Sequence, residues 1–377
     1  MRNRHQHWGP AIGLAVLASL LLALQVLGIS ASQGAAQPPR TPEQVYRGAC
    51  ATCHGRDGKG AAPSSVGFAL PLPDFTDCSF ATREPDSDWF AVIHDGGPAR
   101  AFDPMMPAFA QALSVEDMRK ALAHVRTFCG ERAWPRGDLN LPRPLVTEKA
   151  FPEDEAVFTT AITPKGGTSV ANKIVYEKRI GPRSQVEIVV PYGLKDSSAG
   201  VAHGLGDLAL AFKRSLYHDH ERGTIFSVTG EVVLPTGDEK DGFGKGFTVF
   251  EPFVTFGQVL PGDGFVQFQG GMEIPSDSAK AAKEAFWRTV AGKSFSQRTF
   301  GRAWSPMVEL IGFRELEDGQ KVHWDVVPQI QVSLSTRQHI LANVGVRLPL
   351  NERDGRKTQI LFYLLWDWFD GGLFAGW

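Results

Sequence analysis

Five residues near the N-terminus, the stretch CATCH from Cys50 to His54, have the types and spacing to attach a haem. Two thiols three positions apart can add to the two vinyl groups of one haem, and the histidine that follows can coordinate the iron. The competing interpretation of Cys-x-x-Cys is a thioredoxin-like redox pair. That pair does not need the adjacent His54 and requires a βαβ surround, which the sequence lacks. We therefore expect one covalent haem c, attached to Cys50 and Cys53, with His54 as proximal ligand.

A methionine further along the chain can supply the sixth ligand of that iron. The stretch FDPMMPAFAQAL contains Met105 and Met106, and a thioether is the usual sixth ligand where the function is electron transfer. We choose Met106 because Pro107 follows it and stiffens the loop. Met105 stays open as an alternative, and His94, in VIHDGGPA, is a rival that would give the iron two histidine ligands.

The elements that position these residues are expected to be helices. TPEQVYRGAC predicts a short helix, with Thr41 as its cap and Pro42 in its first turn. A second helix is predicted to begin after Ser114, with Asp117 as its capping-box partner, and to end before Gly130. Its apolar face comprises Val115, Met118, Leu122, Val125 and Phe128, while His124 is expected at the surface.

Together, YRGACATCHGRDGKG, MPAF and LSVEDMRKALAHVRTF resemble a class I cytochrome c domain over about residues 41–130. The resemblance implies a small all-α fold and covalent haem c on the two thiols of the motif. It also implies His54 as proximal and Met106 as distal ligand of the iron. In this family a proline carbonyl often fixes the proximal histidine, and Pro71 and Pro73 are both candidates for that role.

The two remaining cysteines, Cys78 and Cys129, are predicted to form a disulfide. Both lie in a part of the chain that is expected to be exported, and disulfides persist in such compartments. The bridge would tie the middle loop of the helical domain to its last helix. Two buried free thiols are the alternative, because the sequence does not show whether the two Cα atoms lie within the ~7 Å that a disulfide requires.

Residues 1–36 predict a secretory signal peptide. Arg2 and Arg4 precede the apolar run AIGLAVLASLLLALQVLGIS, and small residues follow it, so cleavage is expected after Ser32 or Ala36. A retained membrane anchor is the alternative, since the run approaches the length of a spanning helix. The formal net charge of −2 gives no electrostatic case for a nucleic-acid partner, and none is expected.

Beyond a proline-rich segment, residues 133–150, which predicts a semi-stiff spacer, the sequence alternates with period two. In KVHWDVVPQIQVSLS the even positions from Val322 to Leu334 are apolar, and most odd positions are polar. FVQFQGGMEI, GTIFSVTGEVVL and HILANVGVRLPL show the same alternation, with turn signals such as LEDGQ between the runs. About twelve strands of about ten residues are typical of an antiparallel barrel in an outer membrane.

Several features of this region leave alternatives open. A soluble periplasmic β-sandwich uses the same alternation. The end of the chain, LLWDWFDGGLFAGW, resembles the C-terminal signature of outer-membrane barrels, although Leu361 and Phe362 are both apolar and break the alternation. Residues 276–287 favour a short helix in a long loop. His218 and His220, in YHDHERG, have metal-binding side chains, but an exposed turn is the preferred interpretation.

The expected architecture therefore has two domains: an all-α cytochrome c domain over residues 41–132 and an all-β antiparallel barrel of about 12 strands over residues 151–377. Iron with histidine and methionine ligands leaves no open position for a substrate, so we expect an electron carrier and not an enzyme. The cytochrome domain is expected in the periplasm, tethered to the outer-membrane barrel, with periplasmic redox proteins as partners. The alternatives are a barrel that transports or binds a small molecule, with the haem as a redox accessory, and a cytochrome subunit of a periplasmic oxidoreductase.

Overall fold

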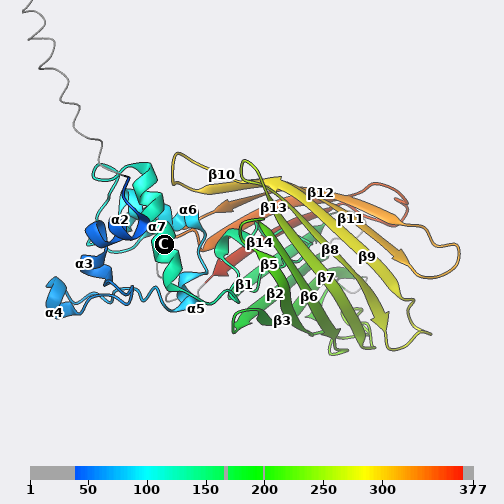
Figure 1. The fold of residues 1–377 in the computed structure, drawn as a ribbon. Helices are drawn as coiled ribbons and strands as arrows, with labels where there is room; N and C mark the ends of the chain where they lie inside the picture. The colour runs from blue at the N-terminus through cyan, green and yellow to red at the C-terminus, as the bar shows by residue number, and fades with distance from the viewer. Residues whose placement is uncertain (1–38, 165–168, 198–199, 368–377) are drawn as a thin grey trace, which may run out of the picture. The chain divides into compact units, whose positions relative to one another are not determined.

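The computed structural model describes residues 39–164, 169–197 and 200–367. The predicted signal peptide and residues 368–377 of the aromatic C-terminus lie outside these residues. The described residues from Pro42 onward belong to one compact unit, which is the one described below. Its first part is helical and its second part is a β-barrel (Figure 1). Among the described residues, no helix is long and apolar enough to cross a membrane.

Short helices build the first part around two apolar clusters. The helices are α2 (Pro42–Ala49), α3 (Ala51–His54), α4 (Pro63–Val66), α5 (Cys78–Ala81), α6 (Asp86–Asp95) and α7 (Val115–Phe128). One cluster is formed by Tyr46, Phe75 and Val125, and the other by Ile93, Met118 and Leu122. Trp89 packs against both clusters and so connects the two sides of the domain.

Helix α7 begins as its sequence predicts. The Ser114 hydroxyl oxygen accepts a hydrogen bond from the Asp117 backbone N–H at 3.1 Å, which confirms the predicted cap. The prediction that Val115 belongs to the buried apolar face is wrong. Its side chain is 48% exposed, because it lies in the first turn, before the buried stretch that begins at Met118. His124 is likewise no free surface residue, because its ring lies 5.0 Å from that of Tyr46 on α2.

The second part is a single sheet of 14 strands, of which 12 close into a barrel (Figure 1). The barrel strands are β1 (Glu155–Thr163), β2 (Ser169–Ile180), β3 (Ser184–Ser197), β5 (Ala209–Asp219), β6 (Thr224–Val233), β7 (Val249–Leu260), β8 (Gly264–Pro275), β9 (Glu284–Lys293), β11 (Ala303–Glu315), β12 (His323–Ser333), β13 (Ile340–Pro349) and β14 (Gln359–Asp367). The other two, β4 (Gly200–Leu205) and β10 (Phe295–Ser296), pair with β3 and β11 and continue the lines of β5 and β9. Antiparallel pairing of β1 with β14 and of β9 with β11 leaves no free edge, which confirms the predicted fold class.

The inner face of the barrel carries many polar side chains beside several apolar clusters, and the outer face is apolar. On β12 the side chains of Asp325, Gln329 and Gln331 are buried, and Pro328 and Ile330 between them are exposed. Other buried polar residues of the strands include Glu155, Glu177, Gln185, Lys213, Gln267, Gln269, Glu309 and Asn343. Exposed apolar residues include Phe158, Ile174, Ile188, Leu210, Phe212, Val308, Leu310, Val344, Ile360 and Leu364. A soluble sandwich would bury the second set, so this arrangement favours a barrel whose outer face contacts lipid.

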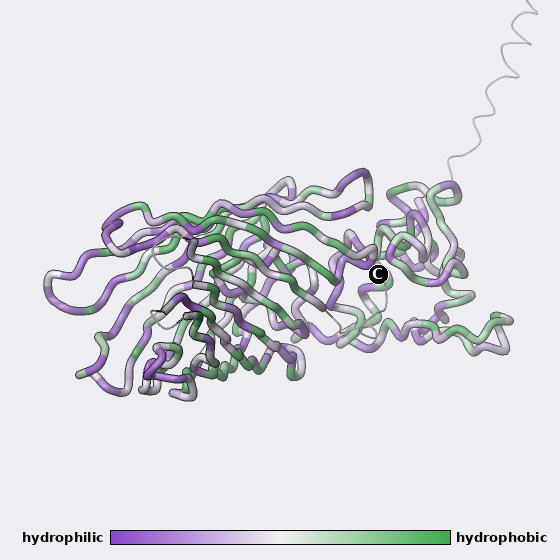
Figure 2. The backbone as a smooth tube through the Cα atoms, turned by 180° about the vertical axis from the view of Figure 1, so that it is seen from behind, coloured by the Kyte–Doolittle hydropathy of each residue, from purple (hydrophilic) through white to green (hydrophobic). Residues whose placement is uncertain are grey.

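The two ends of the barrel differ in the length of their connections. At the end where β1 begins, the turns are short, such as residues 181–183, 220–223 and 261–263. At the other end the connections are longer, such as residues 234–248 and 350–358. Figure 2 shows hydrophilic residues concentrated in the connections at that far end.

Two predictions about local structure are wrong and one is resolved. Residues 276–287 form no helix, because β9 begins at Glu284 and pairs with both β8 and β11. The proline-rich segment is no extended spacer, because residues 139–153 fold into the barrel and contact its inner wall. In β14 the alternation continues: Leu361 is buried inside the barrel and Phe362 is exposed outside it. Leu361 is apolar because it packs in the cluster that receives Leu145 and Val146 of the inserted segment.

Candidate haem site

The CATCH motif forms one tight helical turn at the end of α2. The Cys50 N–H donates to the Tyr46 carbonyl at 2.8 Å, and the His54 N–H donates to the Cys50 carbonyl at 3.0 Å. This turn brings Cys50, Cys53 and His54 together, as the spacing predicts. Both thiols are half-buried and neither takes part in a disulfide.

Tyr46 fixes the end of this turn. Its side chain is fully buried, and its hydroxyl donates to the Gly55 carbonyl at 2.7 Å, directly after the motif. Gly55 has a φ of 75°, the left-handed conformation that glycine adopts without strain. The Tyr46 ring also meets the Phe128 ring of α7 edge-on at 5.2 Å, which joins the motif to the last helix. Sequence reasoning missed Tyr46, although its position four residues before Cys50 places it one helical turn away.

Burial sets the protonation of the motif. Desolvation, with the nearby Cys53 thiol as a smaller cause, raises the pKa of the Cys50 thiol to about 11. Reactive cysteines of redox pairs have lowered pKa values instead, so this environment does not suit thiol–disulfide exchange. Desolvation also lowers the pKa of His54, which favours the neutral imidazole that binds metals.

The residues around the motif fit a haem. His54 stacks on Phe75 with ring centroids 4.9 Å apart, and its Nδ1 is buried without a hydrogen-bond partner among the described residues. The indole Nε1 of Trp89, which packs against Phe75, is also buried without a partner. Such unpaired buried groups are uncommon and require an explanation. Two unpaired thiols, a neutral imidazole and an apolar wall are the donor set and the surroundings that covalent haem needs. Neither Pro71 nor Pro73 accepts a hydrogen bond from His54 here.

The loop that carries the two methionines is held against α6. The Met106 carbonyl accepts a hydrogen bond from the Gly97 N–H at 3.0 Å, and the Phe109 N–H donates to the Ile93 carbonyl at 3.0 Å. A side chain at Gly97 would place its Cβ 2.2 Å from the Asp103 carbonyl oxygen, so the loop requires glycine there. Met106 is half-buried, whereas Met105 is 52% exposed.

The rival ligand His94 has other partners. Its Nδ1 lies 2.6 Å from an Asp95 carboxylate oxygen, and its ring lies 5.2 Å from that of Phe300, in the turn between β10 and β11. The imidazole therefore lies where the helical part meets the barrel.

A disulfide joins Cys78, the first residue of α5, to Cys129, the residue after α7. The two Cα atoms lie 5.1 Å apart, and 51 positions of sequence separate the two residues. The bond fixes the middle loop to the helix whose Phe128 supports the motif.

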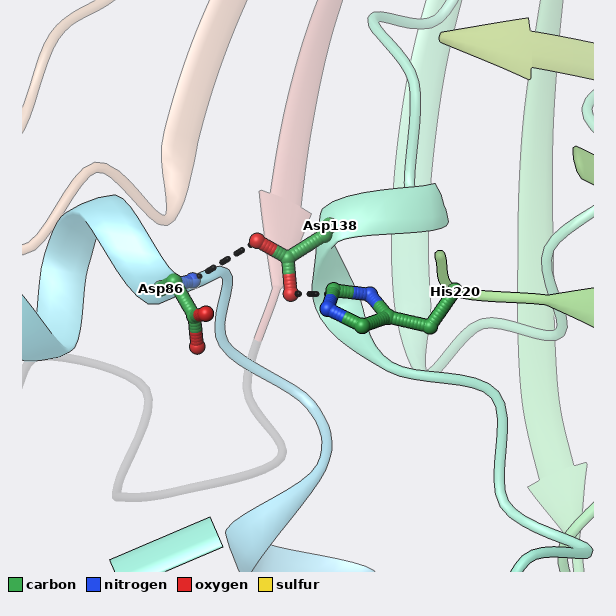
Figure 3. A group of neighbouring side chains, drawn as sticks. All are labelled: Asp86, Asp138 and His220. Carbon is green, nitrogen blue, oxygen red and sulfur yellow. Dashed lines mark hydrogen bonds and ion pairs between the residues drawn. The ribbon is translucent and has the colours of Figure 1, made fainter. Parts of the chain in front are cut away.

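A second group of potential ligands, Asp86, Asp138 and His220, lies where the helices meet the barrel (Figure 3). Figure 3 shows that the Asp86 backbone, and not its carboxylate, faces Asp138; this N–H donates to Asp138 at 3.0 Å. His220 Nδ1 lies 3.7 Å from the other Asp138 oxygen. The Asp86 carboxylate pairs with Arg126 and Arg136, so two guanidinium groups already neutralise it. Asp86, Asp138 and His220 therefore form a contact between the helical part and the barrel.

His218, in β5, also contacts the helical part: its Nε2 lies 3.0 Å from the Arg132 carbonyl oxygen. The expected turn is confirmed for His220, at the start of residues 220–223, and is wrong for His218, which lies in β5. Both side chains are only partly exposed, because they reach residues that precede the barrel. No sequence pattern predicts this contact, since His218 and Arg132 are 86 positions apart.

Comparison with known families defines the class of each part. Residues 37–125 match the family model described as cytochrome C oxidase, cbb3-type, subunit III. The helical part is thus a cytochrome c domain, a class that implies a haem cofactor, and it precedes a 12-strand barrel of the outer-membrane type. Residues 157–363, more than half of the chain, match a second model, and the chain belongs to that family, described as putative MetA-pathway of phenol degradation.

Solved structures with the barrel fold show low sequence identity. An outer membrane channel from Pseudomonas putida F1 is 13% identical, with a TM-score of 0.43 over 60% of this chain and 99% of that chain. The KdgM porin in complex with disordered oligogalacturonate is 8% identical, with a TM-score of 0.37 over 56% and 98%. The NanC porin is 7% identical, with a TM-score of 0.39 over 56% and 98%. A comparison with curated proteins found no match.

Proposed function

We propose that this protein is a one-electron carrier with one haem c bound covalently to Cys50 and Cys53, and with His54 and Met106 as axial ligands. The observation that carries this proposal is the pair of unbonded thiols on one helical turn beside a half-buried, neutral histidine. The bound haem would supply the Fe(II)/Fe(III) couple. The chain orients it through the turn that Tyr46 fixes, and shields it with Phe75 and Trp89. Histidine and methionine ligands leave no position for a substrate, so the domain is a carrier and not an enzyme.

The location follows from the barrel. Its apolar outer face suits lipid, and the helical domain adjoins the end with the short turns, as the contact of His218 with Arg132 shows. Short turns are typical of the periplasmic end of outer-membrane barrels, and longer loops of the outer end. The cytochrome domain is thus a periplasmic domain of an exported protein anchored in the outer membrane. It exchanges electrons with periplasmic redox proteins.

Fractionation of cells that express the full chain tests this proposal. The outer-membrane fraction, stained for covalent haem on a gel with and without boiling, is expected to show one haem band whose mobility changes on heating. Such a shift is produced by a barrel that stays folded in detergent until it is boiled. A haem band confined to the soluble periplasmic fraction would contradict the membrane location and support a cytochrome subunit of a periplasmic oxidoreductase.

The distal ligand has its own test with a matched control. Met106→Ala is expected to remove the sixth ligand and shift the absorption spectrum of the ferric protein toward high spin, because the iron loses its thioether. Met105→Ala, one position away on the exposed side of the loop, is expected to keep the low-spin spectrum. The opposite pattern assigns the ligand to Met105, and two unchanged spectra assign it to a histidine, for which His94→Ala is the next variant.

A second candidate function is passage of a small molecule through the barrel. The many polar side chains of the inner wall favour it, since polar lumen residues are typical of a channel in a membrane barrel. The description of the family names phenol degradation, which makes small aromatic molecules the first solutes to test. Uptake of phenol into liposomes that contain the protein, compared with empty liposomes, would measure this passage.

A further inference from the structure

The segment 139–153, between the cytochrome domain and the first strand, occupies the inside of the barrel. Its apolar side chains all pack in clusters with the inner wall: Leu139, Leu141, Leu145, Val146, Ala150 and Phe151. Its polar contacts reach Gln185 on β3, Gln269 on β8 and Glu309 on β11. Because these strands lie on different sides of the barrel, the segment fills the interior and does not line one side.

One wall residue, Glu309, holds the backbone at the middle of the segment. Its carboxylate accepts hydrogen bonds from three successive backbone N–H groups, those of Leu145 at 2.9 Å, Val146 at 3.1 Å and Thr147 at 2.8 Å. It also accepts one from the Thr147 hydroxyl at 2.7 Å. Glu309 and Thr147 are almost completely buried. A buried turn without regular structure needs partners for its backbone donors, and this wall supplies them.

Ion pairs between the segment and the inner wall hold the segment at a second position. Arg143 is buried, and its guanidinium lies 2.5 Å from Glu155 on β1 and 3.0 Å from Glu177 on β2, with Glu148 of the same segment at 3.3 Å. Both wall carboxylates are fully buried. Removal of the segment would leave these carboxylates without Arg143 as their counter-ion, and a buried charge without a partner is strongly unfavourable.

The wall also leaves room for the segment. A Cβ atom at Gly345 on β13 would lie 2.6 Å from Leu145 Cδ1, and one at Gly257 on β7 would lie 3.0 Å from Leu141 Cδ1. Glycine at these two positions therefore opens space for two leucine side chains of the segment. Shape, hydrogen bonds and charge all match, so the segment has a specific binding site inside the barrel.

Both ends of the segment are tied to the cytochrome domain. Before it, the Gly137 N–H donates to the Thr82 carbonyl at 2.7 Å, and Asp138 accepts from the Asp86 N–H. After it, Asp154 pairs with Arg83. The same region of the domain is fixed to the end of the barrel, because Glu84 pairs with His339 at 2.6 Å and Arg100 donates to the Phe300 carbonyl at 2.8 Å.

We propose that residues 139–153 are a plug that closes the barrel to solutes, and that the docked cytochrome domain keeps this plug in place. The proposal rests on the membrane-spanning barrel of the proposed function. It adds that passage of a small molecule requires the plug to leave the interior. The structure assigns to the cytochrome domain a second role, which is to hold the two ends of the plug at the short-turn end of the barrel.

Conductance of the full haem-loaded chain in planar bilayers tests the plug. The wild type is expected to stay at the baseline of the bare bilayer, because the plug fills the pore. Arg143→Ala combined with Glu309→Ala is expected to give stepwise open-channel currents, since loss of buried charged partners raises the population of the released plug on the order of a hundredfold. The matched control is Lys321→Ala with Glu352→Ala, which removes one cation and one carboxylate from an exposed pair and should leave the baseline unchanged.

A cysteine in the plug gives a second measurement that does not depend on the stability of that variant. With Cys50 and Cys53 bound to haem and the other two cysteines in a disulfide, Thr147→Cys introduces a lone thiol at a buried site. Its reaction with a membrane-impermeant maleimide is expected to be at least about tenfold slower than that of Ser278→Cys in an exposed loop, because labelling follows the open population. Adding His339→Ala, which removes the partner of Glu84, is expected to speed the labelling of Thr147→Cys.

The outcomes separate this proposal from the proposed function. Wild-type currents as large as those of the Arg143 and Glu309 variant, or equal labelling of the two thiols, would overturn the plug. Labelling of Thr147→Cys that His339→Ala leaves unchanged would overturn the role of the cytochrome domain in holding it. A protein that fails to enter bilayers at all would instead contradict the membrane barrel, whatever the state of the segment.

Discussion

The cytochrome domain and the barrel place their apolar residues on opposite sides. In the helical domain Tyr46 and Met118 are buried in a core, with at most 1% of their surface exposed. In the barrel Glu309 is fully buried, and its neighbours Val308 and Leu310 are 47% and 42% exposed. Apolar surface moves away from water, so the two regions must face different solvents: water around the helices and lipid around the strands.

The two regions also differ in how their chain is closed. The barrel closes through hydrogen bonds, because β14 pairs with β1 and no strand is left at an edge. The cytochrome domain has short helices with free ends, which need capping side chains, and a disulfide between Cys78 and Cys129. A small core gives limited stability by itself, so cross-links and caps matter more in the helical domain than in the barrel.

The largest effect is expected from the disulfide. Cys78→Ser with Cys129→Ser should lower the free energy of unfolding of the cytochrome domain by about 4 kcal/mol, because a loop of this length gains that much entropy in the unfolded chain. Unfolding in guanidinium, followed by the haem absorbance, measures the free energy of unfolding of the cytochrome domain. The unfolding of the barrel in the same samples should be unchanged. Two free thiols in the native wild type, detected by alkylation before reduction, would show that the bond is not formed.

The next largest effect is expected from a valine-to-arginine substitution on the outer face of the barrel. The same substitution on the surface of the helical domain shows whether the two surfaces face different solvents. Val344 on β13 and Val115 on α7 are both 48% exposed. Val344→Arg should destabilise the barrel by about 2–4 kcal/mol, because it places a charge on the lipid face near the middle of a strand. The measurement is the folded fraction in liposomes by heat-modifiable mobility.

Val115→Arg is the matched control and should change stability by less than about 0.5 kcal/mol, because that position faces water. Equally small losses of stability at the two sites would mean that the outer face of the barrel is exposed to water. That result would favour a soluble β-domain over a membrane barrel.

Much of this architecture was predictable because it depends on local spacing. The positions of Cys50, Cys53 and His54 place them on one turn whatever the rest of the chain does. Period-two alternation predicted the strands, and it holds in β12 from Asp325 to Ser333. The cap at Ser114 needs only a hydroxyl three residues before a free N–H.

The inserted segment was not predictable by the same reasoning. Its prolines are typical of a spacer, and its partners are far away in sequence: Glu309 lies 162 positions from Thr147. The one local sign was the pair Leu361 and Phe362, which breaks the polar pattern because Leu361 packs in the cluster beside the plug. The role of Tyr46 was missed for a similar reason, since a tyrosine in a short helix has no distinctive pattern.

A smaller effect is expected at the start of α7. Ser114→Ala should lower the stability of the cytochrome domain by about 1 kcal/mol, because the Asp117 N–H loses its acceptor. Ser114→Gly is the control and should lower it by only a few tenths of a kcal/mol. Thermal unfolding followed by circular dichroism distinguishes the two. A Ser114→Ala variant as stable as the wild type would mean that the hydroxyl contributes nothing to the cap.

The smallest effect is expected at Asp86, where the two regions meet. Burial by itself would raise the pKa of this carboxyl, but Arg126 and Arg136 outweigh it and lower the pKa below its ordinary value of 3.8. A lowered pKa means that the folded state binds the proton more weakly than the unfolded state. The stabilisation is therefore present above about pH 3.8 and is lost as the pH falls below it. Because the side chain is 41% exposed, water weakens both ion pairs.

Asp86→Asn should thus lower the melting temperature of the cytochrome domain at pH 7, and the difference from wild type should shrink toward pH 3. Glu116→Gln removes a carboxylate from a pair with Lys120 in which Glu116 is 76% exposed, and should have less effect at either pH. A difference between Asp86→Asn and wild type that stays constant from pH 7 to pH 3 would show that the carboxylate acts through its shape and not its charge. The joint between the two regions would then depend on the neutral contact of the Asp86 N–H with Asp138, which the substitution keeps.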